Sequence, residues 1–185
     1  MKYNPTPLEG AYTIELEPRA DERGFFSRVY CENEFSTHGL ETHYVQFNTS
    51  FTQKKHTLRG MHYQLGDSAE VKVIKCIRGS LFDVILDLRQ DSETFGKWFG
   101  AELSDQNRKM MYVPRGFAHG FQALTDDVEM MYFVSNTYSA TNERSVRWND
   151  PKFSIDWPFE PVMISEKDAS ARDFETGFHL GKETP

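Results

Sequence analysis

The feature that most constrains the fold is a long central region of short apolar segments that end at turn residues. From Gly60 to Trp148 no segment shows the periodicity of an amphipathic helix. The turn Arg78-Gly79-Ser80, for example, separates the apolar segment 71–77 from the segment 81–88. Such spacing is typical of antiparallel strands rather than of alternating strands and helices. An aromatic content of 14% also favours strands, because flat rings pack well on pleated surfaces. The sequence therefore predicts an all-β fold, a sandwich or a barrel.

Length and charge limit the domain organisation and the class of partner. With 185 residues the chain can build one domain with a substantial core, and no repeat or linker divides it. We expect a single domain over residues 1–185. The formal net charge of −7 argues against non-specific binding to nucleic acid or to an anionic membrane. The N-terminal segment MKYNPTPLEG lacks the apolar stretch of a signal peptide, and no apolar run reaches membrane-spanning length, so we expect a cytoplasmic protein.

Side-chain alternation indicates which residues share a strand face. One face of the segment 81–88 is entirely apolar and is predicted to be core, whereas the opposite face also carries two aspartates. Lys72 shares its face with apolar residues of the segment 71–77, and Tyr132 with those of the segment 128–134. Alternation alone leaves two interpretations open for this pair, inward functional groups or an edge-strand charge and an ordinary core ring. The predicted core face consists of Phe82, Val84, Leu86 and Leu88.

Two short helices are predicted near the ends of the chain. Residues 32–35 have the composition of a short helical turn. The segment 165–171 begins with the S-x-x-D pattern of a capping box. In this pattern Ser165 caps the start of the helix, and the Asp168 side chain reaches back to the backbone N–H of Ser165.

Two of the six histidines, His62 and His119, lie in suggestive surroundings. The segment 114–119 has the pattern P-x-G-x-x-H, which resembles the second motif of the cupin superfamily of small jelly-roll barrels. Metal-binding cupins pair it with H-x-H and a nearby glutamate, but Gln64 replaces the second histidine. Two histidines make a poor closed site for a divalent transition metal. We therefore expect a cupin-like jelly-roll barrel with short peripheral helices, no metal and no cofactor; a metal-dependent cupin oxygenase is the alternative.

Six stretches of the sequence carry a more specific resemblance. They occur in the same order as in one family: DERGFF at 21–26, QFNTS at 46–50, LRGMHYQ at 58–64, FDVILDLRQDSETFGKW at 82–98, VPRGFAHGF at 113–121 and RWNDPKFSIDWP at 147–158. Over nearly its whole length the chain resembles the dTDP-4-dehydrorhamnose 3,5-epimerase family. The resemblance implies a jelly-roll homodimer that epimerises a nucleoside-diphosphate 4-keto-6-deoxy sugar at C3 and C5 without a cofactor.

The resemblance also implies catalytic roles. A ketone at C4 acidifies the protons on C3 and C5, so an epimerase needs a base on one face of the sugar and an acid on the other. It also needs a positive group near the enolate oxygen. By resemblance, His62 is the base, Tyr132 the acid and Lys72 the cation. The family orients its base with an aspartate in an S-x-K-D context, which identifies Asp168, with Asp173 as the alternative.

Substrate contacts follow from the same resemblance. Arginine suits a diphosphate because its planar fork binds phosphate oxygens bidentately. Arg59 and His62 would lie on opposite faces of a regular strand, so a bend at Gly60 is needed to bring both to one pocket. Arg23 resembles an arginine that reaches the phosphates from the neighbouring subunit. The remaining implied substrate contacts are Phe26, Gln46, Asn48, His119 and Tyr138.

Two residues depart from the family pattern. Arg28 stands where the family usually has a glutamate near the nucleobase. A carboxylate accepts the thymine N–H whereas arginine only donates, so another pyrimidine such as cytosine stays open. Phe133 stands where lysine is common, but alternation places it on the face opposite Tyr132, so we expect only a packing change. The alternative functions are a C3-only epimerase of a related 4-keto sugar and a non-catalytic sugar-binding cupin.

Overall fold

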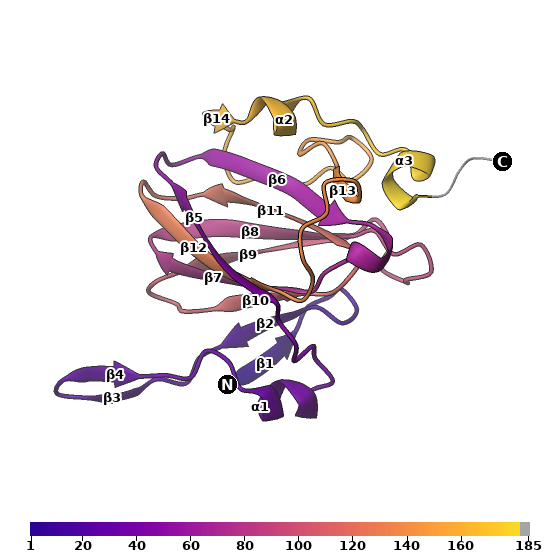
Figure 1. The fold of residues 1–185 in the computed structure, drawn as a ribbon. Coiled ribbons are helices and arrows are strands. Elements are labelled where there is room, and N and C mark those ends of the chain that lie inside the picture. Colours follow the sequence, from indigo (N-terminus) through magenta and orange to yellow (C-terminus); the bar gives the residue numbers. More distant parts are fainter. Residues whose placement is uncertain (182–185) are drawn as a thin grey trace.

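The computed structural model describes residues 1–181, and residues 182–185 of the predicted domain lie outside that range. The described chain consists mainly of strands in two large sheets that face each other (Figure 1). The first sheet has the order β1 (Lys2–Pro5), β2 (Tyr12–Glu15), β10 (Met110–Val113), β7 (Lys72–Arg78), β12 (Val128–Val134) and β5 (Gln46–Thr52). The second has the order β13 (Glu143–Ser145), β6 (Thr57–Gln64), β11 (Phe117–Ala123), β8 (Ser80–Asp87) and β9 (Trp98–Ser104), and β14 (Met163–Ile164) also pairs with β6. The predicted all-β class is confirmed.

Strands β5 to β12 have the order of a jelly roll. The set β5-β12-β7-β10 in one sheet faces the set β6-β11-β8-β9 in the other, and all these neighbours are antiparallel. Apart from the β8–β9 hairpin, every connection within this set crosses from one sheet to the other. The cupin-like jelly roll is therefore confirmed, and its eight strands form two sheets rather than one closed barrel.

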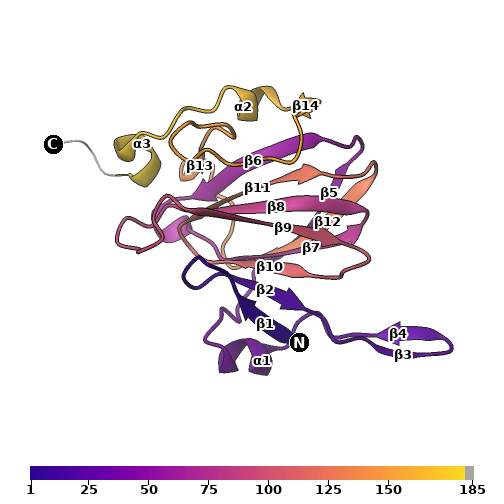
Figure 2. The ribbon, with the colours of Figure 1, turned by 180° about the vertical axis from the view of Figure 1, so that it is seen from behind.

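Three apolar clusters hold these layers together. The cluster between the sheets includes Ile74 and Met130 from the first sheet and Ile85 and Phe121 from the second. The N-terminal segment and α1 (Glu32–Thr37) cover the outer face of the first sheet, and the C-terminal segment covers the outer face of the second (Figures 1 and 2). Each sheet is thereby covered on both faces over much of its area.

Strand β8 shows a consequence of this double covering. Its face containing Val84 and Leu86 is buried as predicted, but it packs against the C-terminal segment. The opposite face carries Leu81 and Ile85 into the cluster between the sheets, and Asp83 on that face is also fully buried. Alternation identified the two faces but not which one lines the interior, because a strand covered on both sides buries both.

The helices are short and peripheral. Besides α1, they are the 3-10 turn η1 (Gly66–Ser68), α2 (Glu166–Ala169) and α3 (Thr176–Leu180). Both helices expected from the sequence are present. Ser165 caps α2 as predicted, because its hydroxyl accepts the Asp168 backbone N–H at 3.1 Å. Within the described residues, no helix is long and apolar enough to cross a membrane.

A two-stranded hairpin projects from the body of the molecule. It consists of β3 (Arg19–Asp21) and β4 (Gly24–Phe26), and every residue of both strands is exposed (Figures 1 and 2). Phe25 and Phe26 keep 51% and 69% of their surface exposed, although Arg108 stacks on the Phe25 ring at 4.3 Å. The hairpin therefore presents two large apolar side chains at the surface.

Candidate active site

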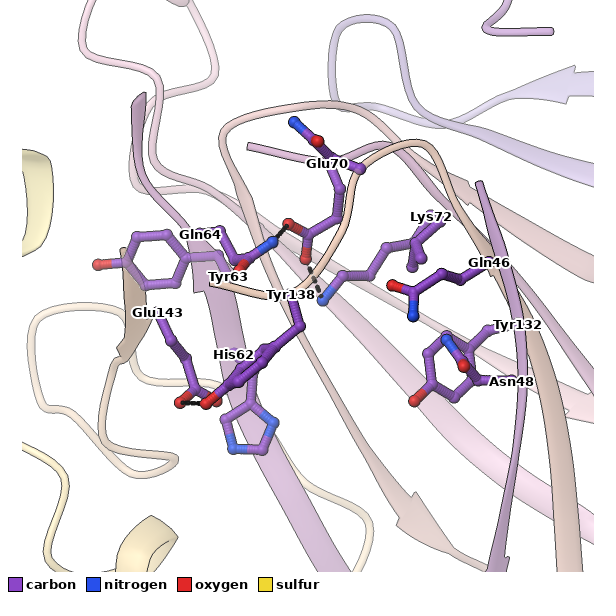
Figure 3. A pocket seen from close by; sticks show the side chains of 12 residues that line it. Gln46, Asn48, His62, Tyr63, Gln64, Glu70, Lys72, Tyr132, Tyr138 and Glu143 are labelled. Atoms are coloured by element: carbon purple, nitrogen blue, oxygen red, sulfur yellow. Dashed lines mark hydrogen bonds and ion pairs between the residues drawn. The ribbon is translucent and has the colours of Figure 1, made fainter. Parts of the chain in front are cut away.

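A cleft between the inner faces of the two sheets contains most of the predicted site residues. One part of it is a cavity of about 200 Å³, and a second part has a volume of about 180 Å³. The two parts share His62, Lys72 and Tyr132, so these three side chains lie at the centre of a continuous cleft. Gln46, Asn48, Tyr138 and Glu143 line the first part (Figure 3). Arg59, His119, Ser50 and Met130 line the second.

Strand pairing explains why these side chains meet. Tyr132 is opposite Asn48 on one neighbouring strand and Ile74 on the other, so it points toward the second sheet with them. Lys72 lies on the same inner face of β7. His62 is opposite His119 in the second sheet. The inward orientation expected for Lys72 and Tyr132 is confirmed, and His62 and Tyr132 approach the cleft from opposite sheets (Figure 3).

A β-bulge brings Arg59 and His62 to the same side of β6. His62 pairs with His119 but Arg59 pairs with Phe121, so the three-residue step from 59 to 62 matches a two-residue step on β11. The extra residue cancels the odd spacing and turns both side chains inward. Gly60 adopts a φ of +130°, and a Cβ there would lie 2.5 Å from the Gly120 Cα. The predicted bend at Gly60 is confirmed, and only glycine fits it.

His62 is held by Asp168. Its Nε2 donates to Asp168 Oδ1 at 2.6 Å, and the Gly60 N–H donates to Asp168 Oδ2 at 3.3 Å. Burial opposes ionisation of Asp168, but the contacts with His62, Gly60 and Ser165 lower its pKa overall. Because an ionised carboxylate only accepts hydrogen bonds, Nε2 carries the ring proton and Nδ1 is the nitrogen that can accept one. Asp173 instead pairs with Arg147 at 2.7 Å, so Asp168 is the aspartate at His62.

Tyr132 and Lys72 occupy the opposite wall. Burial raises the pKa of Tyr132, and the Glu70 charge raises it further whereas Arg59 lowers it. The phenol therefore stays protonated at neutral pH and can act as an acid. The Lys72 ammonium pairs with Glu70 at 2.9 Å, and both side chains are largely buried.

A second histidine–carboxylate pair lies deeper in the cleft. His119 Nε2 is 2.7 Å from Asp83 Oδ1, and Asp83 is fully buried. Burial raises the pKa of Asp83, although the His119 and Lys72 charges oppose that rise. Among residues 1–181, no hydrogen-bond partner reaches Asp83 Oδ2. Nearby, Arg59 donates to Thr52 Oγ1 and to the Phe51 carbonyl, each at 3.1 Å, which fixes its guanidinium beside β5.

The rim includes charged residues that the sequence did not reveal. Tyr138, a predicted substrate contact, is 64% exposed, and its hydroxyl donates to Glu143 at 3.0 Å. Glu143 also pairs with Lys167 at 2.7 Å. Burial opposes ionisation of Glu143, but Lys167, Tyr138 and the nearby His62 lower its pKa. Glu143 lies outside the sequence motifs described above, so nothing in the sequence indicated that it would be at the site. Lys167 could have been noticed only because it is part of the S-x-K-D segment.

Other predicted residues lie outside the cleft. Arg23 and Phe26 are on the projecting hairpin, where Arg23 pairs with Asp21 at 2.6 Å. Arg28 pairs with Glu34 at 2.8 Å on the surface. Phe133 is buried on the outer face of the first sheet, with its ring 4.6 Å from that of Phe47, so the packing role expected for it is confirmed.

Gln64, which replaces the second histidine of the cupin H-x-H motif, makes structural hydrogen bonds. Its amide nitrogen donates to Glu70 at 2.6 Å and to the Ser68 carbonyl at 2.9 Å, and its oxygen accepts the Ser139 N–H. Within residues 1–181, no group of three or more His, Cys, Asp or Glu side chains is arranged to hold a metal ion.

Comparison with known proteins gives consistent matches along the chain. The family model described as dTDP-4-dehydrorhamnose 3,5-epimerase matches residues 5–176. A dTDP-4-dehydrorhamnose 3,5-epimerase from Methanothermobacter thermautotrophicus is 42% identical over 171 residues, covering 91% of each chain. The crystal structure of the dTDP-4-dehydrorhamnose 3,5-epimerase from Elizabethkingia anophelis is 44% identical with a TM-score of 0.91, over 94% of this chain and 96% of that one. A dTDP-4-dehydrorhamnose 3-epimerase from Streptomyces niveus is 36% identical, covering 92% of this chain and 83% of the relative.

Proposed function

Because the chain belongs to the dTDP-4-dehydrorhamnose 3,5-epimerase family, we propose that it epimerises C3 and C5 of a dTDP-linked 4-keto-6-deoxy sugar without a cofactor. The observation that carries the proposal is the placement of a carboxylate-held histidine and a protonated tyrosine on opposite walls of one cleft, with a lysine beside them. An epimerase must take a proton from one face of a carbon and return one to the other face.

In this mechanism His62 and Tyr132 work from opposite sheets. His62 Nδ1 removes the proton from the carbon next to the ketone, and the electron pair of the broken C–H bond moves into the C4 carbonyl to form an enolate. The Lys72 ammonium stabilises the charge on the enolate oxygen. Tyr132 then gives its hydroxyl proton to the opposite face of the carbon, and solvent restores both groups.

Arg59 and His119 at the deeper end, and Gln46 and Asn48 on β5, supply polar contacts for the sugar and its phosphates. At the rim the exposed Tyr138 ring offers a stacking surface for the nucleobase, and Glu143 and Lys167 hold that ring in place. A base-stacking surface accepts more than one pyrimidine, so the base preference requires a direct test.

The test is proton NMR in heavy water with dTDP- and CDP-linked 4-keto-6-deoxy sugars in parallel. We expect deuterium at C3 and C5 of the dTDP sugar, with a much slower reaction of the CDP sugar. Exchange confined to C3 would support the 3-epimerase alternative, for which the Streptomyces niveus relative is the precedent. If no substrate exchanges faster with the wild-type protein than with His62→Ala, the proposed reaction is wrong.

We further propose a cytoplasmic homodimer in which each hairpin completes the site of the other subunit. Supporting this, the hairpin exposes Arg23, Phe25 and Phe26, and β5 is the last strand of its sheet, with Phe47 and Phe51 exposed at 61% and 49%. An uncovered edge strand with exposed phenylalanines is a pairing surface.

Coexpression of Arg23→Ala and His62→Ala chains with different tags tests the shared site. If the partner supplies Arg23, one site of the purified heterodimer carries both defects and the other is intact, so about half of the wild-type activity returns. If each chain uses its own Arg23, both sites are defective and the heterodimer stays as inactive as the two variants alone.

A further inference from the structure

The catalytic cation of the cleft has a fixed anionic partner. Lys72 Nζ lies 2.9 Å from Glu70 Oε1, and the two side chains are only 14% and 7% exposed. Glu70 lies just before β7, two residues from Lys72, and both line the same cavity (Figure 3). Surface ion pairs contribute little, but a pair this buried holds both side chains in one arrangement.

Glu70 is itself held by a third side chain. Its Oε2 accepts the Gln64 amide N–H at 2.6 Å while its Oε1 faces Lys72, so each carboxylate oxygen has a different partner. Gln64 is in turn anchored to the Ser68 carbonyl and the Ser139 N–H, which belong to two separate loops. The carboxylate is therefore fixed by the fold and does not simply follow the lysine.

The other acidic residue that lines the cavity, Glu143, does not compete for Lys72. Glu143 pairs with Lys167 and accepts the Tyr138 hydroxyl. A lysine side chain is a flexible four-carbon stem, and holding its ammonium in one place costs conformational entropy. An ammonium has three N–H donors, so pairing with Glu70 restrains it and still leaves donors for a ligand oxygen.

We propose that Glu70, held in place by Gln64, is a positioning residue that fixes the Lys72 ammonium beside the enolate oxygen. This inference rests on the proposed epimerase function and assigns the Gln64–Glu70 pair a part in it. It also gives a reason for glutamine at position 64: its amide both donates to Glu70 and ties two loops to the cleft.

The charge of Glu70 provides a second readout, because it also contributes to the raised pKa of Tyr132. Removing that charge lowers the Tyr132 pKa, so the acid is lost at a lower pH. A residue that only stabilised the fold would leave this alkaline limb of the pH profile unchanged. The other charged or titratable groups that line the cleft with Tyr132 include Arg59, His62, Lys72 and His119, with Asp83 paired to His119, and Glu143 and Tyr138 at the rim.

The experiment compares Glu70→Ala and Glu70→Gln with wild type, using deuterium exchange and product formation for kcat and KM, and thermal unfolding for stability. Glu70→Ala leaves the ammonium unrestrained, and we expect kcat to fall roughly tenfold or more with little change in KM. Glu70→Gln keeps one acceptor oxygen, which can serve Lys72 or Gln64 but not both, so we expect a smaller loss of kcat than in Glu70→Ala, together with a shift of the alkaline limb to lower pH. The matched control is Glu15→Ala, which removes an exposed ion pair with Lys109 at 3.7 Å and should change neither parameter.

The outcomes separate the two proposals. Exchange by the wild-type protein, with kcat unchanged in both Glu70 variants or with the alkaline limb unchanged in both, would overturn the positioning role and leave the epimerase function intact. No exchange by the wild-type protein would instead overturn the function itself. If Glu70→Ala does not fold, the nearly isosteric Glu70→Gln decides through its pH profile.

Discussion

The most direct test of the site is Asp168→Asn, which keeps the shape of the side chain and removes its charge. An amide that turns its NH2 toward His62 forces Nε2 to become the acceptor, so Nδ1 holds the proton and the ring is no longer a base. Loss of a general base costs about 10²- to 10⁴-fold in rate. A hydrogen bond to a charged group contributes about 1.5–3 kcal/mol, and Asp168 is only 3% exposed, so we expect a loss of folding stability of that order.

Initial rates of deuterium incorporation and urea unfolding measure the two effects. The matched control is Asp173→Asn on the same segment, which removes an exposed pair with Arg147. We expect Asp173→Asn to exchange deuterium at the wild-type rate and to lose less than about 1 kcal/mol of unfolding free energy. If Asp168→Asn keeps more than about a tenth of the wild-type rate, the tautomer explanation fails, whatever happens to stability.

Three further predictions follow from the same geometry. Gly60→Ala places a Cβ against backbone atoms of β11 at a φ of +130°, so it should cost about 3 kcal/mol or more in urea unfolding. Gly39 also has a positive φ, but a Cβ there would meet open space, so Gly39→Ala should cost only about 1–2 kcal/mol of unfolding free energy. Equal losses in the two variants would contradict the close approach of Gly60 to β11. Tyr132→Phe should abolish epimer formation yet let His62 exchange deuterium into unepimerised substrate, and product formed at the wild-type rate would exclude Tyr132 as the acid. Because folding lowers the Asp168 pKa, its contribution to stability is present above its unfolded pKa of about 4 and is lost as pH falls through the folded value. The difference in unfolding free energy between wild type and Asp168→Asn should therefore shrink below about pH 4, and a difference that grows there would refute this.

The sequence predicted the parts of the site that depend on strand periodicity. Lys72 and Tyr132 share a face with apolar residues, and that parity is why both point between the sheets. The odd spacing of Arg59 and His62 required an irregularity at Gly60, and the bulge supplies it. Both inferences depend only on the alternation of side chains along a strand, which holds wherever the pairing is regular.

Residues that reach the cleft from loops and short edge strands were not predictable in this way. Glu70, Glu143 and Lys167 each take part in an ion pair, but in the sequence a charged residue outside a motif looks like any solvated one. The partner of His62 was assigned from the S-x-K-D resemblance, because strand alternation does not say whether Asp168 or Asp173 would reach His62. Tertiary structure distinguishes the two aspartates, because the parallel pairing of β14 with β6 places α2, which contains Asp168, next to His62.

The C-terminal segment shows why chemistry and packing cannot be separated in this fold. It covers the outer face of the second sheet, where it buries Val84 and Leu86. The same segment brings Asp168 to β6 at the bulge, where the Gly60 N–H and His62 both donate to its carboxylate. The glycine that lets Arg59 and His62 share a face thus also exposes a backbone donor to the aspartate that orients His62. A change at Gly60 should consequently disturb Arg59, His62 and Asp168 together, so its effect on rate should exceed what its loss of stability alone explains.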